Sequence, residues 1–455
     1  ETLTNSVTAS YDSLKNASGN QSAPLGANGE AGGARQFTSA SAEATIQIIP
    51  VEVDPKRVIT TSNSALAVLP APQPVSIGEE IEFELKTSIP VAQLRSFTIR
   101  DELPLGIRCV EAPAVNLDVA PYAAAGFTPG GTFVPTCTDT EVSWNFGDQT
   151  VTMGGGGGNR FDFAIDFIAR VDNIVENQDG TAIVNGGAAT VAEVRYVDES
   201  GTPVVISIDE ANLVVREPAI DLTKTFSVVE ADADDVPRVI VVATNNGTAT
   251  AYNLRVLDDL SAIGLSYQGN IQGVTPPTAD VVTLGANQPL FTWPSGFSVV
   301  PGNSVTFSFD VQVDSLVQPL TEIDNTVQAD WTSLPAITTA LNDSGLIGAN
   351  GSATGMRIGA LPNLADALND YEAEAVAALP VPGLTITKTD LVPALVPRIG
   401  AYKTFEVRID IPEGMTENLV VADSLDAGGV SYVLSHNADF DITYQFDGIA
   451  TLNGL

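Results

Sequence analysis

The sequence predicts an all-β chain built from antiparallel β-sandwiches. Apolar and polar residues alternate with a period of two over many segments, whereas sustained helical periodicity is almost absent. The segments in which this alternation is clearest are 81–85, 161–171, 305–313 and 405–411. Such alternation predicts strands with one buried and one solvated face, as in antiparallel sandwiches.

The elements follow in order along the chain. Ile81, Phe83 and Leu85 alternate with Glu82 and Glu84, and the later segments repeat this pattern with Phe, Val and Ile. The best helical candidate is 361–379, which is equally compatible with a loop that leads into a strand. We therefore expect little or no helix.

The composition excludes several classes of function. The 455 residues include 20 Lys and Arg against 56 Asp and Glu, which gives a net charge of −36, and one histidine, His436. Such an acidic chain repels phosphate backbones, so no nucleic-acid partner is expected. A single histidine argues against the usual serine and cysteine triads, so we expect no enzyme beyond autocatalytic chemistry. No apolar run reaches the roughly 18 residues of a membrane-spanning helix, and no such segment is expected.

The two cysteines, Cys109 and Cys137, lie 28 positions apart. We favour a structural disulfide, which requires an oxidising compartment. The alternative is a pair of unpaired buried thiols. The disulfide would place this chain outside the cytosol.

Internal repeats divide the chain into domains. A front signature, a lysine followed by an Asp-x-Leu motif, occurs at Lys56 and Asp101, Lys224 and Asp258, and Lys388 and Asp423. A back signature contains an asparagine and occurs at Asn5, Asn185 and Asn325. The signatures predict the C-terminal part of a preceding sandwich at 1–50, complete sandwiches at 51–217 and 218–380, and the N-terminal part of a following sandwich at 381–455.

A longer period relates the first front to the third. Gly78 and Gly400 are 322 positions apart, as are the strings GANGEAGGAR and GANGSATGMR that begin at Gly26 and Gly348. The repeating unit is therefore predicted to be a pair of unlike domains. Both ends of the chain fall inside predicted domains. We favour the explanation that the chain is a window cut from a longer tandem array of domains. The alternative is a subunit that polymerises head to tail by strand complementation.

Several motifs occur in a fixed order within 218–380: DLTKTFSVV, NNGTATAYNLRVLDDL, NSVTFSFDVQV and IDNTVQADWTSLP. Together they resemble the DUF11-type conserved repeat domain of large bacterial cell-surface proteins. The front at 56–107 resembles the isopeptide-forming fimbrial repeat domains of the same broad group. These resemblances imply immunoglobulin-like β-sandwiches on an extracellular bacterial surface.

The fimbrial resemblance also implies a Lys–Asn isopeptide bond in each domain, with a buried acid that shuttles protons. Burial favours the neutral, nucleophilic form of lysine and the protonated form of the acid, so the chemistry needs all three residues inside. The residues implied are Lys56, Asp101 and Asn185; Lys224, Asp258 and Asn325; Lys388 and Asp423; and Asn5.

The sequence departs from this pattern in three places. Lys56 lies in Asp-Pro-Lys-Arg instead of Thr-Lys-Thr, and Asn185 precedes glycine instead of threonine. Asp259 directly follows Asp258, although alignment with Asp101 favours Asp258 as the inward residue. The alternative interpretation is that these Asp and Asn residues cap strands and turns without any crosslink.

The acidic cluster 230–235 contains a candidate calcium site formed by Asp232, Asp234 and Asp235. The alternative is a solvated acidic surface, and no other cofactor is expected. The features together predict a structural segment of an extracellular bacterial surface fibre or giant tandem-repeat surface protein. It would act as a mechanical stalk or filament whose partners are neighbouring copies of the same protein or array. An adhesin module that binds a glycan or protein of a host or environmental surface is the alternative.

Overall fold

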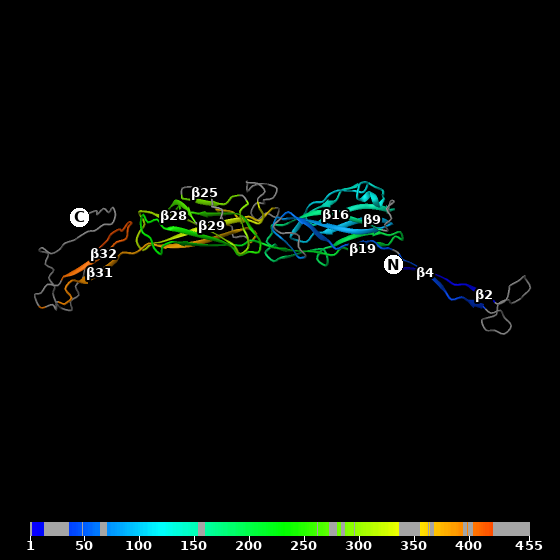
Figure 1. Cartoon of the computed structure of the whole chain (residues 1–455), viewed down its shortest axis with the longest axis horizontal. Coiled ribbons are helices and arrows are strands. Elements are labelled where there is room, and N and C mark those ends of the chain that lie inside the picture. Colours follow the sequence, from blue (N-terminus) through cyan, green and yellow to red (C-terminus); the bar gives the residue numbers. More distant parts are fainter. Residues whose placement is uncertain are drawn as a thin grey trace, which may run out of the picture.

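The computed structural model confirms the all-β fold class. The residues that it describes are 2–12, 36–47, 49–63, 71–152, 160–261, 263–272, 280–283, 287–294, 296–335, 355–362, 364, 368–394, 398 and 404–421. Within these residues the one helical element is a 3-10 turn, η1 (Tyr122–Ala125). Two sandwiches lie end to end, and a narrow hairpin projects from each end of the pair (Figure 1). No helix in the described part of the chain has the length and hydropathy needed to cross a membrane.

The first sandwich is formed by sixteen strands. They are β5 (Glu52–Val53), β6 (Arg57–Thr61), β7 (Gln73–Val75), β8 (Glu80–Pro90), β9 (Ala92–Glu102), β10 (Ile107–Glu111), β11 (Val115–Asn116), β12 (Phe127–Thr128), β13 (Thr132–Phe133), β14 (Thr136–Cys137), β15 (Glu141–Val151), β16 (Arg160–Val171), β17 (Ala182–Asn185), β18 (Ala192–Val197), β19 (Pro203–Ser207) and β20 (Ala211–Val215). One main sheet has the order β10–β16–β8–β5, with β6 also on β8, and the other has the order β12–β15–β9–β18–β19. A smaller sheet, β17–β20–β7, includes the parallel pair β20–β7.

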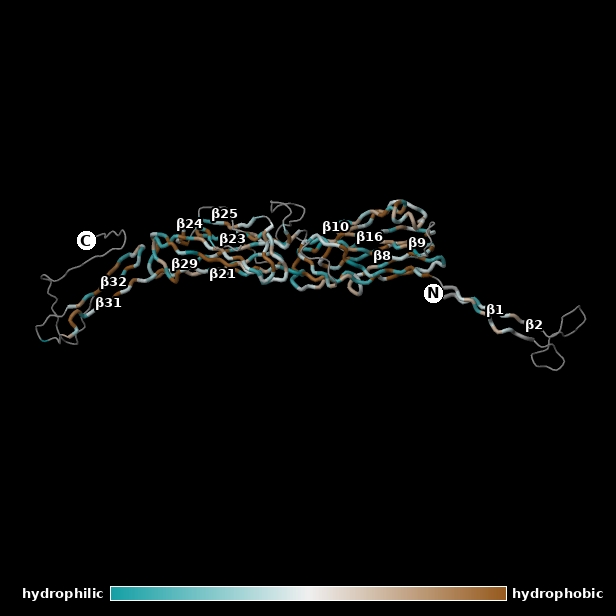
Figure 2. The backbone as a smooth tube through the Cα atoms, viewed as in Figure 1, coloured by the Kyte–Doolittle hydropathy of each residue, from teal (hydrophilic) through white to brown (hydrophobic). Residues whose placement is uncertain are grey.

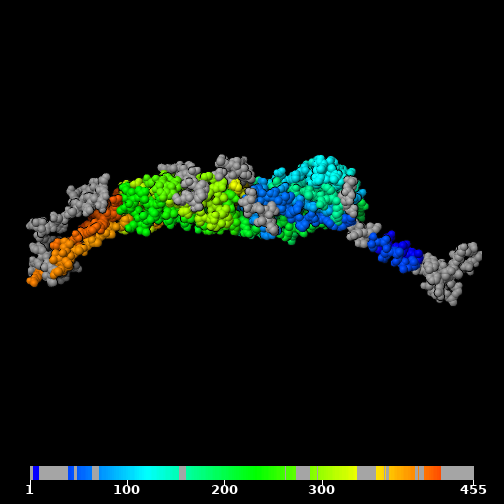
Figure 3. All heavy atoms as spheres, in the orientation of Figure 1, coloured from blue at the N-terminus to red at the C-terminus, as the bar shows by residue number. Residues whose placement is uncertain are grey.

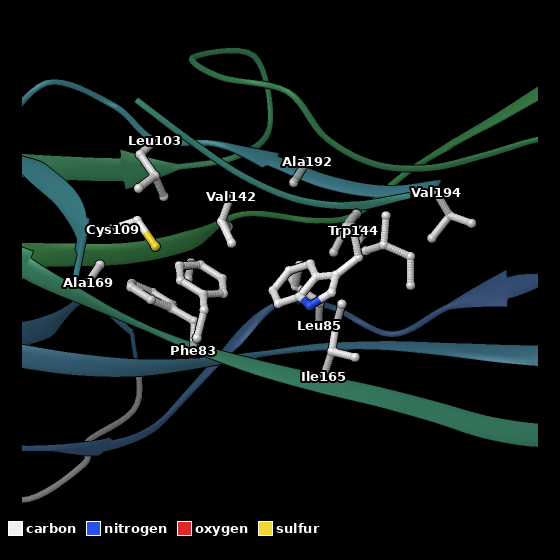
Figure 4. Close-up of a cluster of buried hydrophobic side chains, with 14 of the residues drawn as sticks. Phe83, Leu85, Leu103, Cys109, Val142, Trp144, Ile165, Ala169, Ala192 and Val194 are labelled. Atoms are coloured by element: carbon white, nitrogen blue, oxygen red, sulfur yellow. The ribbon is translucent and has the colours of Figure 1, made fainter. Parts of the chain in front are cut away.

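Aromatic side chains join the two main sheets of this sandwich. Phe163 of β16 meets Phe97 of β9 and Phe146 of β15 edge to face, with ring centroids 5.8 and 5.2 Å apart. Trp144 from one sheet and Phe83 from the other are fully buried and belong to the same cluster (Figure 4). This core forms because every second residue along each strand is apolar and points toward the opposite sheet.

The second sandwich repeats the architecture with fewer strands. They are β21 (Ile220–Phe226), β22 (Arg238–Asn245), β23 (Ala251–Asp258), β24 (Leu265–Gln272), β25 (Asp280–Thr283), β26 (Pro289–Thr292), β27 (Ser298–Val299), β28 (Ser304–Val313), β29 (Glu322–Thr332) and β30 (Glu372–Pro380). The sheet β21–β22–β28–β24 faces the sheet β25–β26–β23–β29–β30. Phe291 of β26 contacts Phe307 and Phe309 of β28, with ring centroids 4.6 and 4.9 Å apart. Hydrophobic and hydrophilic residues alternate along the strands of both sandwiches (Figure 2).

The helical interpretation of 361–379 is wrong for residues 372–379, which form a strand. Glu372–Pro380 forms strand β30, which pairs antiparallel with β29 along its whole length. Leu379 is fully buried and Ala377 nearly so, whereas Ala378 between them is exposed. The alternative of a loop leading into a strand is the correct one, because pairing with β29 outweighs the helical preference of alanine.

The projecting hairpins have the alternating sequence of sandwich strands, but no second sheet packs on them among the described residues. Strand β1 (Thr2–Val7) pairs with β4 (Ala42–Gln47) and β2 (Ser10–Asp12) with β3 (Gln36–Thr38) at one end. At the other end β31 (Thr385–Asp390) pairs with β32 (Phe405–Asp410). The expectation that one face of 405–411 is buried is wrong here: Phe405 is 46% and Ile411 47% exposed, since no described opposing sheet covers them.

Candidate isopeptide sites

A lysine, an aspartate and an asparagine meet inside the first sandwich. Lys56 lies just before β6, Asp101 on β9 and Asn185 at the end of β17, so each comes from a different sheet. The Lys56 Nζ donates a hydrogen bond to Asp101 Oδ1 at 2.7 Å, and Asn185 Nδ2 donates to Asp101 Oδ2 at 3.2 Å. Lys56 is 4% exposed and the other two residues are fully buried. The carboxyl group therefore bridges the amine and the amide.

The second sandwich holds the same three residue types. Lys224 Nζ of β21 donates to Asp258 Oδ2 of β23 at 2.6 Å, and both side chains are fully buried. Asn325 of β29 is also fully buried, and its side chain opposes the rise in the pKa of Asp258 although no hydrogen bond joins the two. Asp259 is exposed instead, and its carboxylate accepts a hydrogen bond from the Ser261 hydroxyl. Asp258 is thus the inward residue of the adjacent pair.

Strand periodicity explains why these polar side chains are inside. Ile220, Leu222 and Lys224 occupy successive inward positions of β21, so the lysine replaces the next apolar residue of the core. Asn325 likewise lies between the inward-facing Ile323 and Val327 of β29. All three members of the second triad, and Asp101 and Asn185 of the first, are positioned by strand register, whereas Lys56 lies directly before β6.

Burial shifts the ionisation of both triads in the direction that nucleophilic chemistry requires. Desolvation lowers the pKa of Lys56, and it lowers the pKa of Lys224 to about 8, although the neighbouring carboxyl groups oppose the shift. Desolvation also raises the pKa of Asp101 and of Asp258, against the opposing charge of the lysines. The neutral forms of amine and acid are therefore favoured relative to water.

Both amides carry polar atoms with no hydrogen-bond partner among the described residues. Asn185 Oδ1, Asn325 Oδ1 and Asn325 Nδ2 are buried in this state, as is Asp258 Oδ1. An unpaired buried polar atom costs about 1–3 kcal/mol, so each of these positions is energetically costly.

A small opening adjoins the first triad. Its volume is about 160 Å³, and Lys56, Gln73, Glu210 and Asn212 are among the residues that line it. The sequence motifs did not place Glu210 or Asn212 beside Lys56, because only the fold brings residues 209–212 to the Lys56 segment. Of the triad residues, Lys56 alone is among those that line this opening.

The third set of candidates is not assembled in the described residues. Lys388 is exposed on β31, with its Nζ 4.9 Å from the centroid of the Phe405 ring. Asn5 is exposed on β1, and Asp423 lies outside the described residues. A role for these three residues stays a prediction.

Cys109 and Cys137 form a disulfide. Cys109 belongs to β10 and Cys137 to β14, which lie in opposite main sheets of the first sandwich. The bond therefore ties the two layers together at one edge, beside the strands that enclose the core. The alternative of two unpaired thiols is wrong.

The calcium candidates lie in the loop between β21 and β22. The Asp232 backbone N–H donates to Asp235 Oδ2 at 3.1 Å, and Asp232 Oδ2 accepts from the Glu413 N–H at 3.0 Å. Within the part of the chain that the structure describes, no group of three His, Cys, Asp or Glu side chains is placed to hold a metal ion. Calcium at Asp232, Asp234 and Asp235 stays a prediction without support from this geometry.

Another buried carboxyl group lies outside both triads. Glu79, between β7 and β8, is fully buried, and its Oε2 accepts the Ser76 N–H at 2.7 Å. Burial raises the pKa of Glu79 to about 7, while hydrogen bonds from Ser76, Thr61 and Asn63 oppose this shift. Glu79 thus differs from the solvated glutamates around it.

Relative to wild type, Glu79→Gln is expected to stabilise the first sandwich more at pH 8 than at pH 4.5. A carboxyl whose folded-state pKa exceeds its usual 4.5 contributes stability below pH 4.5 that is lost as the pH rises toward 7. The amide has no such loss, so its advantage in unfolding free energy should grow by about 2–3 kcal/mol over that range. Calorimetry of both proteins at the two pH values measures it. The control is Glu80→Gln, which removes a carboxylate paired with Arg170; an equal pH dependence in both variants would contradict the assignment.

Comparisons with known proteins do not identify a family. No family model matches the chain, and no curated protein matches it. The C-terminal domain of the Streptococcus pyogenes antigen I/II-family protein AspA aligns at 10% identity and a TM-score of 0.30, covering 63% of this chain and 97% of that one. BcpA, the major pilin subunit of Bacillus cereus, aligns at 9% identity and a TM-score of 0.27, covering 76% and 79%.

A third solved structure is the full-length major pilin SpaD from Corynebacterium diphtheriae. It aligns at 14% identity and a TM-score of 0.26, covering 65% of this chain and 62% of that one. Similarity at this level carries no argument about function, and the DUF11-type resemblance stays a prediction. The tandem β-sandwich architecture stands on the sheets and cores described above.

Proposed function

We propose that this chain is a structural segment of an extracellular bacterial surface fibre, in which each complete sandwich closes a Lys–Asn isopeptide bond. The observation that carries the proposal is the duplication of the site. Two sandwiches of different sequence each bury a lysine, an aspartate and an asparagine, with the lysine amine on the carboxyl at 2.7 and 2.6 Å. A buried cluster of ionisable groups is expensive to retain for stability alone, so its recurrence favours a chemical purpose.

The chemistry of the proposed bond needs only these three side chains. The neutral lysine Nζ adds to the asparagine Cγ and forms the new C–N bond, while the protonated carboxyl donates a hydrogen bond to the amide oxygen. The carboxyl then takes a proton from the lysine nitrogen and gives one to the amide nitrogen, which leaves as ammonia. Amine and primary amide become secondary amide and ammonia, without oxidant or cofactor. The product also removes the unpaired Nδ2 of Asn325.

The mechanical role follows from where the bonds would lie. Lys224 is on the first strand of the second sandwich and Asn325 on the penultimate one, and each is held by long antiparallel ladders. A covalent tie between such strands prevents a pulling force from separating them. The disulfide suits an oxidising exterior, and the net charge of −36 would keep neighbouring fibres apart by repulsion. The proposed partners are further copies of the same protein or array.

The intact mass of the purified full chain tests the proposed bonds. We expect it to fall short of the sequence mass by about 34 Da beyond the disulfide, because each bond releases ammonia of about 17 Da. Asp258→Ala should recover about 17 Da relative to its own sequence mass, since the second sandwich loses its proton shuttle.

Asp259→Ala is the matched control, because it removes the neighbouring carboxylate, which is exposed. It should retain the full deficit. A wild-type mass equal to the sequence mass, corrected for the disulfide, would refute the bonds. The same deficit in Asp258→Ala and wild type would refute the role of Asp258.

A further inference from the structure

We infer that a buried latch, formed by Met356 and Arg357 of the second sandwich, locks the two complete sandwiches into one rigid unit. Arg357 contacts Asn173 and Glu217 at the end of the first sandwich. The two sandwiches lie directly against each other in the space-filling view (Figure 3). This inference concerns the joint between domains and does not depend on the isopeptide bonds.

The hydrogen-bond acceptors of the Arg357 guanidinium group all belong to the first sandwich. Its Nε donates to Asn173 Oδ1 at 2.8 Å, and its Nη2 donates to the carbonyl oxygen of Ile174 at 2.8 Å. Its Nη1 pairs with the Glu217 carboxylate. Arg357 is fully buried and Glu217 is 7% exposed. The planar fork of arginine is thus read by three acceptors, a fit that lysine cannot reproduce.

Residues of the second sandwich support the latch from behind. The Tyr371 hydroxyl donates to Glu217 Oε1 at 2.8 Å, and the Arg357 guanidinium lies 5.7 Å from the Tyr371 ring centroid. The Trp331 ring stacks on Tyr371, with 10° between the planes. Ser333 Oγ accepts the Arg357 N–H at 3.0 Å and donates to the Ile77 carbonyl of the first sandwich at 2.7 Å. The contact therefore combines charge, stacking and backbone recognition.

A glycine of the first sandwich makes room for the latch. Gly78 has φ +84°, and a Cβ there would lie 2.6 Å from the Met356 Cα. Met356 is 1% exposed, so its side chain is enclosed where its segment passes Gly78. Only glycine permits both this backbone conformation and this approach.

Bending at this joint would break all of these contacts together. Opening it would leave Glu217 or Arg357 buried without its partner, or expose both, and breaking a buried ion pair is strongly destabilising. The joint after the second sandwich differs. There the Met415 N–H donates to the Val317 carbonyl at 2.9 Å and the Glu413 N–H to Asp232 at 3.0 Å, and no buried ion pair crosses it among the described residues. Stiffness is thus expected within a pair and bending between pairs.

The arginine of the latch recurs at the long period, whereas Met356 is replaced by Ala34. The string that ends at Arg357 recurs 322 positions earlier and ends at Arg35. The acceptor does not recur at every joint: Glu217 is seven residues before Lys224, and the residue seven before Lys388 is Val381. One latch in every two joints is the pattern that a rigid two-domain unit requires.

Distance measurements between spin labels on the full chain test the latch. Labels on Ser207→Cys and Thr306→Cys, both exposed and on different sandwiches, should give a narrow distribution in the parent. Arg357→Ala should broaden it by about twofold or more, because the joint can then bend. Arg408→Ala, which removes an exposed arginine paired with Asp410, should leave it unchanged.

A second variant keeps the test valid if Arg357→Ala misfolds. Arg357→Met combined with Glu217→Gln removes both charges, so neither is left buried alone, while the side-chain volume is nearly kept. It should broaden the distribution as well, with the melting of each sandwich retained in calorimetry. A distribution as narrow as that of the parent in both variants would overturn the latch.

Discussion

Stretching single molecules of Asp258→Ala should release about 350 Å more chain from the second sandwich than stretching the wild type. The proposed bond from Lys224 to Asn325 closes a loop of 101 positions, and a closed loop bears no extension. At about 3.3–3.6 Å per residue, the whole of this length becomes available when the bond is absent. Force spectroscopy of the full chain reads this difference directly as contour length.

The same variant should lower the free energy of unfolding of the second sandwich by about 4–5 kcal/mol. Crosslinking a loop of this size removes conformational freedom from the unfolded chain, and the chain-entropy estimate for about 100 residues is of this order. The missing carboxyl also leaves Lys224 buried without its hydrogen-bond partner. This local loss adds to the loss from the missing bond and does not depend on it.

The size of the chain in strong denaturant separates the two contributions. A crosslinked chain stays more compact when fully unfolded, whereas lost packing has no effect in that state. Wild type and Asp259→Ala should elute together by size exclusion in denaturant, and Asp258→Ala should elute earlier. Equal elution of all three, with equal contour lengths, would show that no bond forms in the second sandwich.

The sequence pattern predicted the strands of the clearest alternating segments, and its repeats singled out the residues that meet in the two sandwiches. Alternation along 305–313 predicted β28 because each inward residue, from Val305 to Val313, packs on the opposite sheet. Lys224, Asp258 and Asn325 were aligned by repeated motifs, and the same register brings them together in space. Motif repeats predict these contacts because corresponding positions on corresponding strands of two similar domains have similar surroundings.

Other features could not be read from local pattern. Residues 372–380 are rich in alanine, which favours a helix in isolation, and only their pairing with β29 makes them a strand. Arg357 ended a visibly repeated string, yet its partners Asn173 and Glu217 are 184 and 140 positions away. Nothing in the spacing of one string reveals which domain will receive it.

Removing the disulfide, by Cys109→Ala with Cys137→Ser, should lower the free energy of unfolding of the first sandwich by about 3–4 kcal/mol. The bond closes a loop of 28 positions, for which the chain-entropy estimate has this size. Cys109 is 7% exposed and lies in the core, so the alanine also removes some packing. Calorimetry of reduced wild type beside the double variant isolates the covalent part, and the transition of the second sandwich should not move.

The disulfide loop lies wholly inside the loop that a Lys56–Asn185 bond would close. If both act by restricting the unfolded chain, the disulfide shortens the outer loop from 129 to about 101 positions. This changes the closure entropy only slightly, because that entropy varies with the logarithm of loop length. The effects of the cysteine variant and of Asp101→Ala should therefore add to within about 0.5 kcal/mol when combined. A larger coupling would mean that the two sites share native packing between the sheets, and the chain-entropy account would have to be abandoned for this sandwich.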